Sequence, residues 1–207
     1  MTRCLIVGNA AINDYARIRE YIKPDDFMIC CDGGLRHTKE LMVSPALIVG
    51  DFDSSDKPKT DAEIIELPRE KDDTDSFFAA KEAYKRGFRD FLLIGVFGGR
   101  IDHTLGNISL MLWLYNRGCR CIAVDDSSEM QIVGKETVYI DDTYAFFSLL
   151  CIDGPVSGVK ITGAKFPLTN GTITPEYQYG VSNEVLPQTT AAVRVEDGVM
   201  LLVKDRN

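Results

Sequence analysis

Short apolar runs alternate with amphipathic stretches over about the first 125 residues of the chain. Each run ends at or near a glycine or an aspartate, and this pattern is typical of β-α units. Several runs are apolar at successive positions, as expected of strands that helices cover on both faces. The sequence predicts strands at Arg3–Gly8, Phe27–Cys31, Ala46–Gly50, Phe91–Gly95 and Cys119–Val124, with a shorter one at Ile64–Leu67.

Two helices are well marked in the same part of the chain. They are predicted at Thr74–Arg86 and Asp102–Arg117, and each is followed at once by a glycine, a common residue just beyond a helix end. Leu105, Ile108 and Leu112 share one apolar face of the second helix. Helices that separate successive strands predict a parallel sheet.

The residue pattern changes after Asp126, where β-branched and aromatic residues begin to alternate with polar ones between frequent turn signals. Asp197-Gly198 predicts the turn of a final hairpin, because such turns need positive φ. We therefore predict an α/β protein: a Rossmann-like, three-layer domain with a parallel sheet (residues 1–126), then a small all-β sandwich domain (residues 127–207). A unit of ~80 residues buries little surface, so we expect it to be stabilised by packing against the first domain or against a partner subunit.

Composition narrows the class of protein. The 207 residues are 45% hydrophobic and carry 23 basic against 31 acidic side chains, a net charge of -8 that disfavours nucleic acid as a partner. The chain has no run of about 18 apolar residues and no secretory signal pattern, so we expect a cytoplasmic protein that does not bind membranes. Its 6 cysteines show no CxxC spacing and are predicted to be buried free thiols.

Acidic and glycine-rich motifs follow the predicted strands, where ligands bind in open parallel sheets. In an extended segment Asp51 and Asp53 would point the same way, and a bound Mg²⁺ would relieve their repulsion. Nearby cations and loop backbone suit a metal-bound polyphosphate. The motifs are Asp32-Gly-Gly34, Asp51-Phe-Asp53, Lys71-Asp-Asp-Thr-Asp75 and Gly98-Gly-Arg-Ile-Asp-His103.

Each motif alone also has a structural interpretation. Asp32 can open a tight turn, and the acids before Ser76 can cap a helix. His103 can be a solvated residue in the first turn of its helix, and His37 is expected on the exposed face of a helix. The Asp pair also allows a phosphatase in which Asp51 is the covalent nucleophile, and a non-catalytic nucleotide or metabolite sensor is a further alternative.

The ordered set of four motifs resembles the thiamine pyrophosphokinase (thiamine diphosphokinase) family. The second half is similar to that family through Lys165-Phe-Pro-Leu168 and Gly180-Val-Ser-Asn-Glu184. The resemblance implies an enzyme that transfers the diphosphate of ATP to the hydroxyl of thiamine, giving thiamine diphosphate and AMP. It further implies Mg²⁺ as cofactor and a homodimer with the active site between subunits.

The resemblance also assigns roles to residues. The catalytic acids would be Asp32, Asp51, Asp53, Asp75 and Asp102. The Mg²⁺ ligands would be Asp51, Asp53 and Asp75, and the nucleotide would be held by Lys71, Asp75, Arg100, Asp102 and His103. Thiamine would contact Asp32 and the partner's Ser182 and Asn183. Asp32 and Asp102 stay open as acceptors of the hydroxyl proton, and the aromatic that stacks on thiamine stays open among Phe166, Tyr177, Tyr179, Tyr139 and Tyr144.

Overall fold

The computed structural model describes residues 2–52, 58, 60–68, 70 and 72–206. The chain divides into two compact units, Met1–Asp126 and Ser127–Asn207. Within the described residues, no helix combines the length and the apolar character that a membrane span requires.

The first unit is built on parallel strands in the order β4-β3-β2-β1-β5-β6. The strands β1, β2, β3 and β5 are almost wholly buried, which explains their continuous apolar sequences. Their bounds agree with the predicted ones to within one residue at each end. The strands are β1 (Cys4–Val7), β2 (Phe27–Cys31), β3 (Leu47–Gly50), β4 (Glu63–Glu66), β5 (Asp90–Ile94) and β6 (Arg120–Val124).

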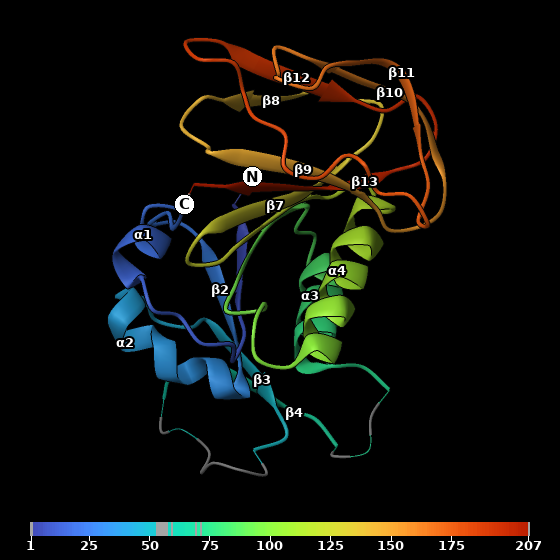
Figure 1. The fold of residues 1–207 in the computed structure, drawn as a ribbon. Coiled ribbons are helices and arrows are strands. Elements are labelled where there is room, and N and C mark those ends of the chain that lie inside the picture. The colour runs from blue at the N-terminus through green and yellow to red at the C-terminus, as the bar shows by residue number, and fades with distance from the viewer. Residues whose placement is uncertain (1, 53–57, 59, 69, 71, 207) are drawn as a thin grey trace. The chain divides into compact units, whose positions relative to one another are not determined.

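Helices lie on both faces of this sheet (Figure 1). One face carries α1 (Tyr15–Arg19), the 3₁₀ helix η1 (Asp32–His37) and α2 (Thr38–Leu41). The other carries α3 (Asp75–Lys85) and α4 (Ile101–Tyr115). The layered α/β arrangement is therefore confirmed, and the two long helices fall where the sequence placed them.

The buried face of α4 is not the one that the leucine spacing indicated. Asn107, Leu110, Met111 and Leu114 are buried, whereas Leu105 is 59% exposed. The helix is apolar on most sides, so periodicity alone could not show which side packs against the sheet. A polar residue, Asn107, takes a buried position.

Chain order reverses between β1 and β5, which are neighbours in the sheet although three strands separate them in sequence. The chain leaves both strands at the same edge, and the two backbones touch there. A Cβ added at Gly8 would lie only 2.5 Å from the carbonyl oxygen of Gly95. Glycine at Gly8 therefore permits a close crossing at the place where open α/β sheets bind their ligands.

The second unit consists of strands that form two antiparallel sets around one apolar core. One set has the order β7-β13-β9 and the other β11-β10-β12-β8. The all-β prediction for this part is confirmed. The strands are β7 (Ser128–Val133), β8 (Val138–Asp141), β9 (Phe146–Cys151), β10 (Val156–Thr162), β11 (Leu168–Ile173), β12 (Thr190–Arg194) and β13 (Met200–Asp205).

The predicted final hairpin is wrong. Gly198 has the expected positive φ of 86°, but the strands on either side of it belong to different sets. β12 pairs with β10 and β8, and β13 pairs with β7 and β9. A turn signal shows that the chain reverses, but it does not show that the flanking strands bond to each other.

An ion pair is buried within the second unit. Lys204 on β13 and Glu129 on β7 face each other in register, and their side chains bond through Nζ and Oε1. Tyr144 donates to the other carboxylate oxygen of Glu129 at 2.8 Å. All three residues are less than 10% exposed, so each charge depends on its partner for compensation.

Candidate active site

Asp32 and Asp51 leave neighbouring strands at the same edge of the sheet. Cys31 of β2 is in register with Val49 of β3, so the next residues, Asp32 and Gly50, also lie side by side. A Cβ added at Gly50 would stand 2.4 Å from the Cβ of Asp32. Asp32 is 9% exposed, which is a low value for a carboxylate. The first two motifs therefore meet, as the parallel-sheet argument predicts.

The reason given for the convergence of Asp51 and Asp53 does not hold. Phe52 has a φ of 51°, in the left-handed region that residues with a side chain rarely adopt. The segment is not extended at Phe52, so simple alternation of side chains does not apply there. Asp53 and Lys71 lie outside the described residues.

The third motif opens α3. Thr74 is the N-cap, and its Oγ1 accepts a hydrogen bond from the amide of Phe77 at 3.3 Å. Asp75 is the first helical residue, where the helix dipole favours a carboxylate. Asp73 pairs with Lys81 at 2.8 Å. The N-cap is therefore Thr74 and not one of the acids, while Asp75 does occupy the first turn, as the structural interpretation expected. The cap places Asp75 at the end of α3 that the chain enters from β4.

The glycine motif forms the tight approach to α4. Gly98 and Gly99 have φ of 94° and 67°, and the amide of Gly98 donates to Oγ1 of Thr104 at 3.2 Å. Arg100 and Asp102 form a two-point ion pair with distances of 2.5 and 3.1 Å. The hydrogen bond from Arg100 holds the pKa of Asp102 below its usual value. The Asp102 carboxylate is therefore charged at neutral pH, and an anionic ligand would compete with it for Arg100.

A buried amide joins the last two motifs. Nδ2 of Asn107 donates to the carbonyl oxygen of Val96 at 2.7 Å, and its Oδ1 accepts from Ser76 at 2.7 Å. Ser76 lies in the first turn of α3, and Val96 lies between β5 and the glycine loop. Asn107 is 7% exposed. One side chain therefore fixes the first turn of α3 against the loop that leads to α4.

His37 is buried, so the prediction of an exposed position is wrong. It is 2% exposed, and its Nδ1 lies 2.7 Å from the hydroxyl of Tyr15. Nε of Arg36 donates to its Nε2 at 3.2 Å, and Nη2 of Arg36 donates to the carbonyl oxygen of Asn9 at 2.5 Å. The short helix η1 turns His37 inward and leaves Arg36 exposed, because neighbouring residues on a helix point in different directions.

Three of the candidate thiamine residues, Phe166, Ser182 and Asn183, lie in loops of the second unit that bond to each other, whereas Asp32 belongs to the first unit. Asn183 is 4% exposed, and its side-chain amide bonds the backbone of Phe166 at both N–H (3.0 Å) and carbonyl (2.8 Å). Ser182 is exposed and has a left-handed φ of 58°. Phe166 is 59% exposed, whereas Tyr144 is 6% exposed. Tyr144 is therefore too deeply buried to stack on a ligand.

The acids supply the ligand type that Mg²⁺ prefers, since carboxylate oxygens are hard donors. Asp32, Asp51 and Asp75 all follow strands or open a helix of the first unit. Within the described residues, no cluster of three or more metal-binding side chains is already assembled. The donor chemistry fits the ion, and the set that would hold it includes Asp53, which is not described.

Comparison with known proteins agrees with these motifs. Residues 18–123 match the family described as "Thiamin pyrophosphokinase, catalytic domain". Residues 135–200 match "Thiamin pyrophosphokinase, vitamin B1 binding domain". The chain belongs to the thiamin pyrophosphokinase family. The two matches fall one in each unit, so the family assignment covers both halves of the protein.

Individual relatives support the family assignment along the whole chain. The thiamine pyrophosphokinase of Bacillus subtilis (strain 168) is 24% identical over 96% of both chains. The solved Bacillus subtilis thiamine pyrophosphokinase superposes with a TM-score of 0.87 at 21% identity and full coverage of both chains. The thiamin pyrophosphokinase of Geobacillus thermodenitrificans gives 0.84 at 26% identity, covering 100% of this chain and 98% of the other.

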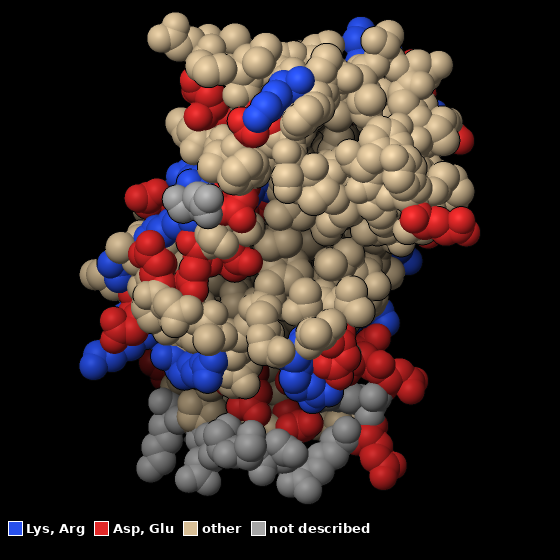
Figure 2. Space-filling model, viewed as in Figure 1, with Lys and Arg blue, Asp and Glu red and all other residues tan. Residues whose placement is uncertain are grey.

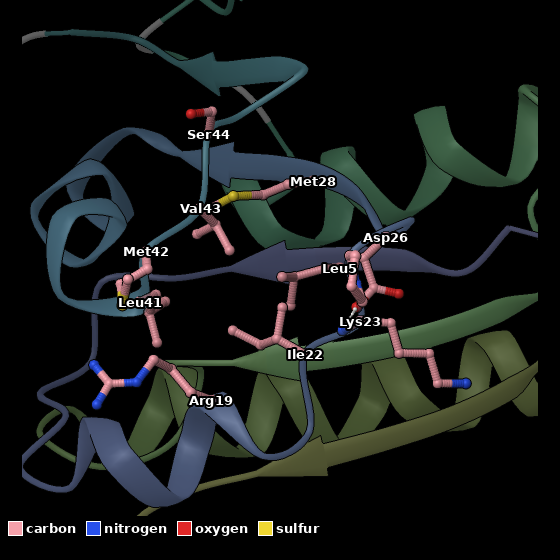
Figure 3. A pocket seen from close by; sticks show the side chains of 11 residues that line it. Leu5, Arg19, Ile22, Lys23, Asp26, Met28, Leu41, Met42, Val43 and Ser44 are labelled. Carbon is pink, nitrogen blue, oxygen red and sulfur yellow. Dashed lines mark hydrogen bonds between the residues drawn. The ribbon is translucent and has the colours of Figure 1, made fainter.

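A separate cavity of about 520 Å³ is not part of this family site. It lies beside α1 and α2 and is lined by Arg19, Lys23, Asp26 and Met42 around a floor of buried core residues (Figure 3). Lys23 and Asp26 precede β2, so the cavity opens toward the amino ends of the strands. It contains none of the residues of the thiamin pyrophosphokinase motifs.

Three residues of the site were not found from the sequence: Asn9, Arg36 and Asn107. Asn9 directly follows the first predicted strand, so the rule that found Asp32 and Asp51 would also have found it. Arg36 and Asn107 gave no such signal, because Arg36 lies inside the short helix η1 and Asn107 is a single polar residue in an apolar helix. Acidic and basic side chains are also mixed on the visible face of the first unit rather than separated by sign (Figure 2).

Proposed function

We propose that this protein is a thiamine diphosphokinase, which transfers the diphosphate of ATP to the hydroxyl of thiamine and releases AMP. The observation that supports this most directly is the family match of both units, together with the acidic motifs that follow adjacent strands of the first unit. We place the reaction in the cytoplasm, which supplies ATP. The phosphatase and the sensor are not favoured, since neither accounts for a match to a vitamin B1 binding domain.

We further propose that the first unit is a Rossmann-like variant with its nucleotide at the reversal between β1 and β5. The strand order places Gly8 and Gly95 at this reversal, and the loop with Gly98 and Gly99 continues from β5. Open α/β sheets bind ligands at such a point. Arg100 and Asp102 would position the phosphates with Lys71, Asp75 and His103.

Mg²⁺ would be held by Asp51, Asp53 and Asp75. When bound, the ion neutralises charge on the phosphate oxygens during transfer. The chain's own residues position the reactants: the N-cap Thr74 fixes Asp75, and Asn107 holds the first turn of α3 against the glycine loop. Asp32 or Asp102 would accept the proton of the thiamine hydroxyl. Placement of the two substrates contributes most of the rate enhancement in such a reaction.

Thiamine would be bound by Asp32 of one subunit and by Ser182 and Asn183 of a second, in a homodimer. In this arrangement Asn183 acts mainly by holding its own loop, because its Oδ1 and its Nδ2 both bond the backbone of Phe166. Phe166 is the best-supported stacking residue, since its ring is exposed and its backbone is fixed. Tyr139, Tyr177 and Tyr179 are alternatives with exposed rings.

The test is to incubate the protein with thiamine, ATP and Mg²⁺ and to follow the products by mass spectrometry. The expected result is thiamine diphosphate and AMP in equal amounts. ADP in place of AMP would contradict diphosphate transfer. ATP binding without turnover would support the sensor, and a phospho-enzyme formed at Asp51 would support the phosphatase.

The metal-binding acids can be tested with Asp51→Asn. We expect its turnover to fall by at least about 10²-fold, because loss of a ligand to the ion removes charge stabilisation in the transition state. The matched control is Asp61→Asn, an exposed aspartate just before β4, where turnover should stay within about twofold of wild type. Equal activities of the two variants would contradict the assignment of Asp51.

A further inference from the structure

Arg36 is an exposed cation at the carboxyl edge of the parallel sheet. It lies on η1, the same short helix that Asp32 opens directly after β2. Four residues of 3₁₀ helix rise by about 8 Å, so Arg36 and Asp32 are close along the helix axis. The neighbouring Gly33 packs on Asn9, since a Cβ there would lie 2.3 Å from the Asn9 side chain.

The guanidinium of Arg36 has a fixed position. Its Nε donates to the buried His37 at 3.2 Å, and its Nη2 donates to the carbonyl oxygen of Asn9 at 2.5 Å. A guanidinium cannot accept a hydrogen bond, so Nε2 of His37 must be unprotonated to receive this one. Nδ1 of His37 lies 2.7 Å from the Tyr15 hydroxyl, and the ring also bonds the backbone of Ala10.

Both partners of Arg36 are uncharged in this arrangement. Within the part of the chain that the structure describes, no carboxylate pairs with Arg36. Arg100, the arginine among the described motif residues, is bonded to the carboxylate of Asp102. A ligand must displace Asp102 to take the full charge of Arg100, but it displaces no charged group at Arg36.

The two bonds also leave part of the guanidinium available. Arginine carries more N–H donors than these two bonds use, and they match the geometry of phosphate oxygens. Asn9, which bonds Arg36, directly follows Gly8, the residue that touches Gly95 at the reversal of strand order. Arg36 therefore lies beside the point proposed above for the nucleotide.

We propose that Arg36 binds a phosphate oxygen of the nucleotide, and that His37 and Asn9 hold it in position for that contact. The inference rests on the proposed function for the identity of the nucleotide. It adds a binding residue outside the four motifs. Arg36 lies in η1, and only the first three residues of that helix, Asp32-Gly-Gly34, belong to a motif. The contact belongs to the nucleotide and not to thiamine, which is a cation and would be repelled by Arg36.

The test compares Arg36→Gln with Arg89→Gln. Arg89 is also exposed and also donates to backbone carbonyls, but it precedes β5 and so lies at the opposite edge of the sheet. We expect Arg36→Gln to raise the KM for ATP about tenfold, equivalent to ~1.4 kcal/mol, with the KM for thiamine within about twofold of wild type. Arg36→Lys should keep part of the affinity, because it retains the charge.

The inference is overturned if the KM for ATP is unchanged in Arg36→Gln, or if both KM values rise together. Calorimetric titration with ATP and Mg²⁺ in the absence of thiamine gives a second reading, in which Arg36→Gln should bind about tenfold more weakly than Arg89→Gln. Because this titration needs no turnover, it separates the two claims. A wild-type protein that makes no thiamine diphosphate would refute the proposed function and leave the role of Arg36 to the titration.

Discussion

Replacement of Asn107 tests whether one buried amide holds the site together. In Asn107→Ala the carbonyl oxygen of Val96 loses its donor at 2.7 Å, and Val96 is 4% exposed. An unsatisfied buried acceptor costs about 1–3 kcal/mol. Ser76 loses its bond to Asn107, worth about 1 kcal/mol, but keeps its contact with Thr74 at 3.2 Å.

Alanine has the higher helix propensity, which offsets about 0.5 kcal/mol. The net destabilisation of Asn107→Ala is therefore about 1.5–3.5 kcal/mol, or about 3–14 °C in Tm for a chain of this size. The control is Ser109→Ala, an exposed position on the same helix, which should change the stability by less than about 0.5 kcal/mol. The assay is thermal unfolding followed by circular dichroism.

Asn107→Asp separates loss of the hydrogen bond from loss of volume. It keeps the shape and an acceptor for Ser76, but it places a carboxyl oxygen against the carbonyl of Val96. Burial and this contact raise the folded-state pKa of the introduced carboxyl above its unfolded value near 3.9. The folded state then binds more protons, so Asn107→Asp should be more stable relative to wild type at pH 5 than at pH 7.

Activity should follow the same logic. At a temperature below the unfolding transition of the variant, Asn107→Ala should lower kcat, because the first turn of α3 carries Asp75 and is no longer fixed to the glycine loop. The reasoning is refuted if Asn107→Ala and Ser109→Ala unfold within about 1 °C of each other. A normal kcat in a destabilised Asn107→Ala would limit the role of Asn107 to stability.

Three further predictions concern other buried groups. Lys204→Met should destabilise the second unit by about 3–5 kcal/mol, because Glu129 stays buried without its cation. Lys204→Met with Glu129→Leu should recover part of this loss in the same unfolding assay, but not the roughly 1–3 kcal/mol that follows when the buried Tyr144 hydroxyl loses its acceptor. Additive losses in the double variant would contradict this. Burial lowers the pKa of His37, assisted by the charge of Arg36 and opposed by a hydrogen bond with the Ala10 backbone. The pKa of His37 is therefore higher in the unfolded state, near 6.5, than in the folded state, so the free energy of unfolding should fall as the pH drops below about 6.5. His37→Gln should make the free energy of unfolding depend less on pH in this range. Burial raises the pKa of Cys30 to about 12, and all 6 cysteines are buried and outside any disulfide. A thiol reagent at pH 8 should therefore react slowly with the native protein, and it should label 6 thiols once the protein is unfolded.

Strands buried on both faces were the easiest part of the fold to predict. Their apolar runs need no choice between faces, so β1, β2 and β3 could be located from composition alone. Helix ends were also predictable, because Thr74 caps α3 and glycines follow α3 and α4. The buried face of α4 could not be chosen, since the sheet decides which of several apolar sides it covers.

Pairing between distant segments was the part that the sequence could not supply. The final turn has the right local chemistry at Gly198, but the partners of β12 and β13 come from elsewhere in the second unit. Local signals fix φ at one residue, whereas strand pairing depends on contacts far apart in the chain. The same limit applies to Phe52, whose left-handed backbone replaces the extended segment assumed from the Asp pair.

The site divides in the same way between residues that a rule can find and residues that only contacts reveal. Asp32, Asp51 and the glycine loop follow strands, so sheet geometry alone predicts that they gather at one edge. Asn107 and His37 are different, because each is a polar side chain that takes a buried position and bonds backbone or a neighbouring side chain there. Such residues have no charge or spacing that marks them, yet they fix the acids and Arg36 in place. If they act as proposed, substitutions at Asn107 and His37 should impair the site without removing any group that touches substrate, and sequence motifs alone would not have selected either position for testing.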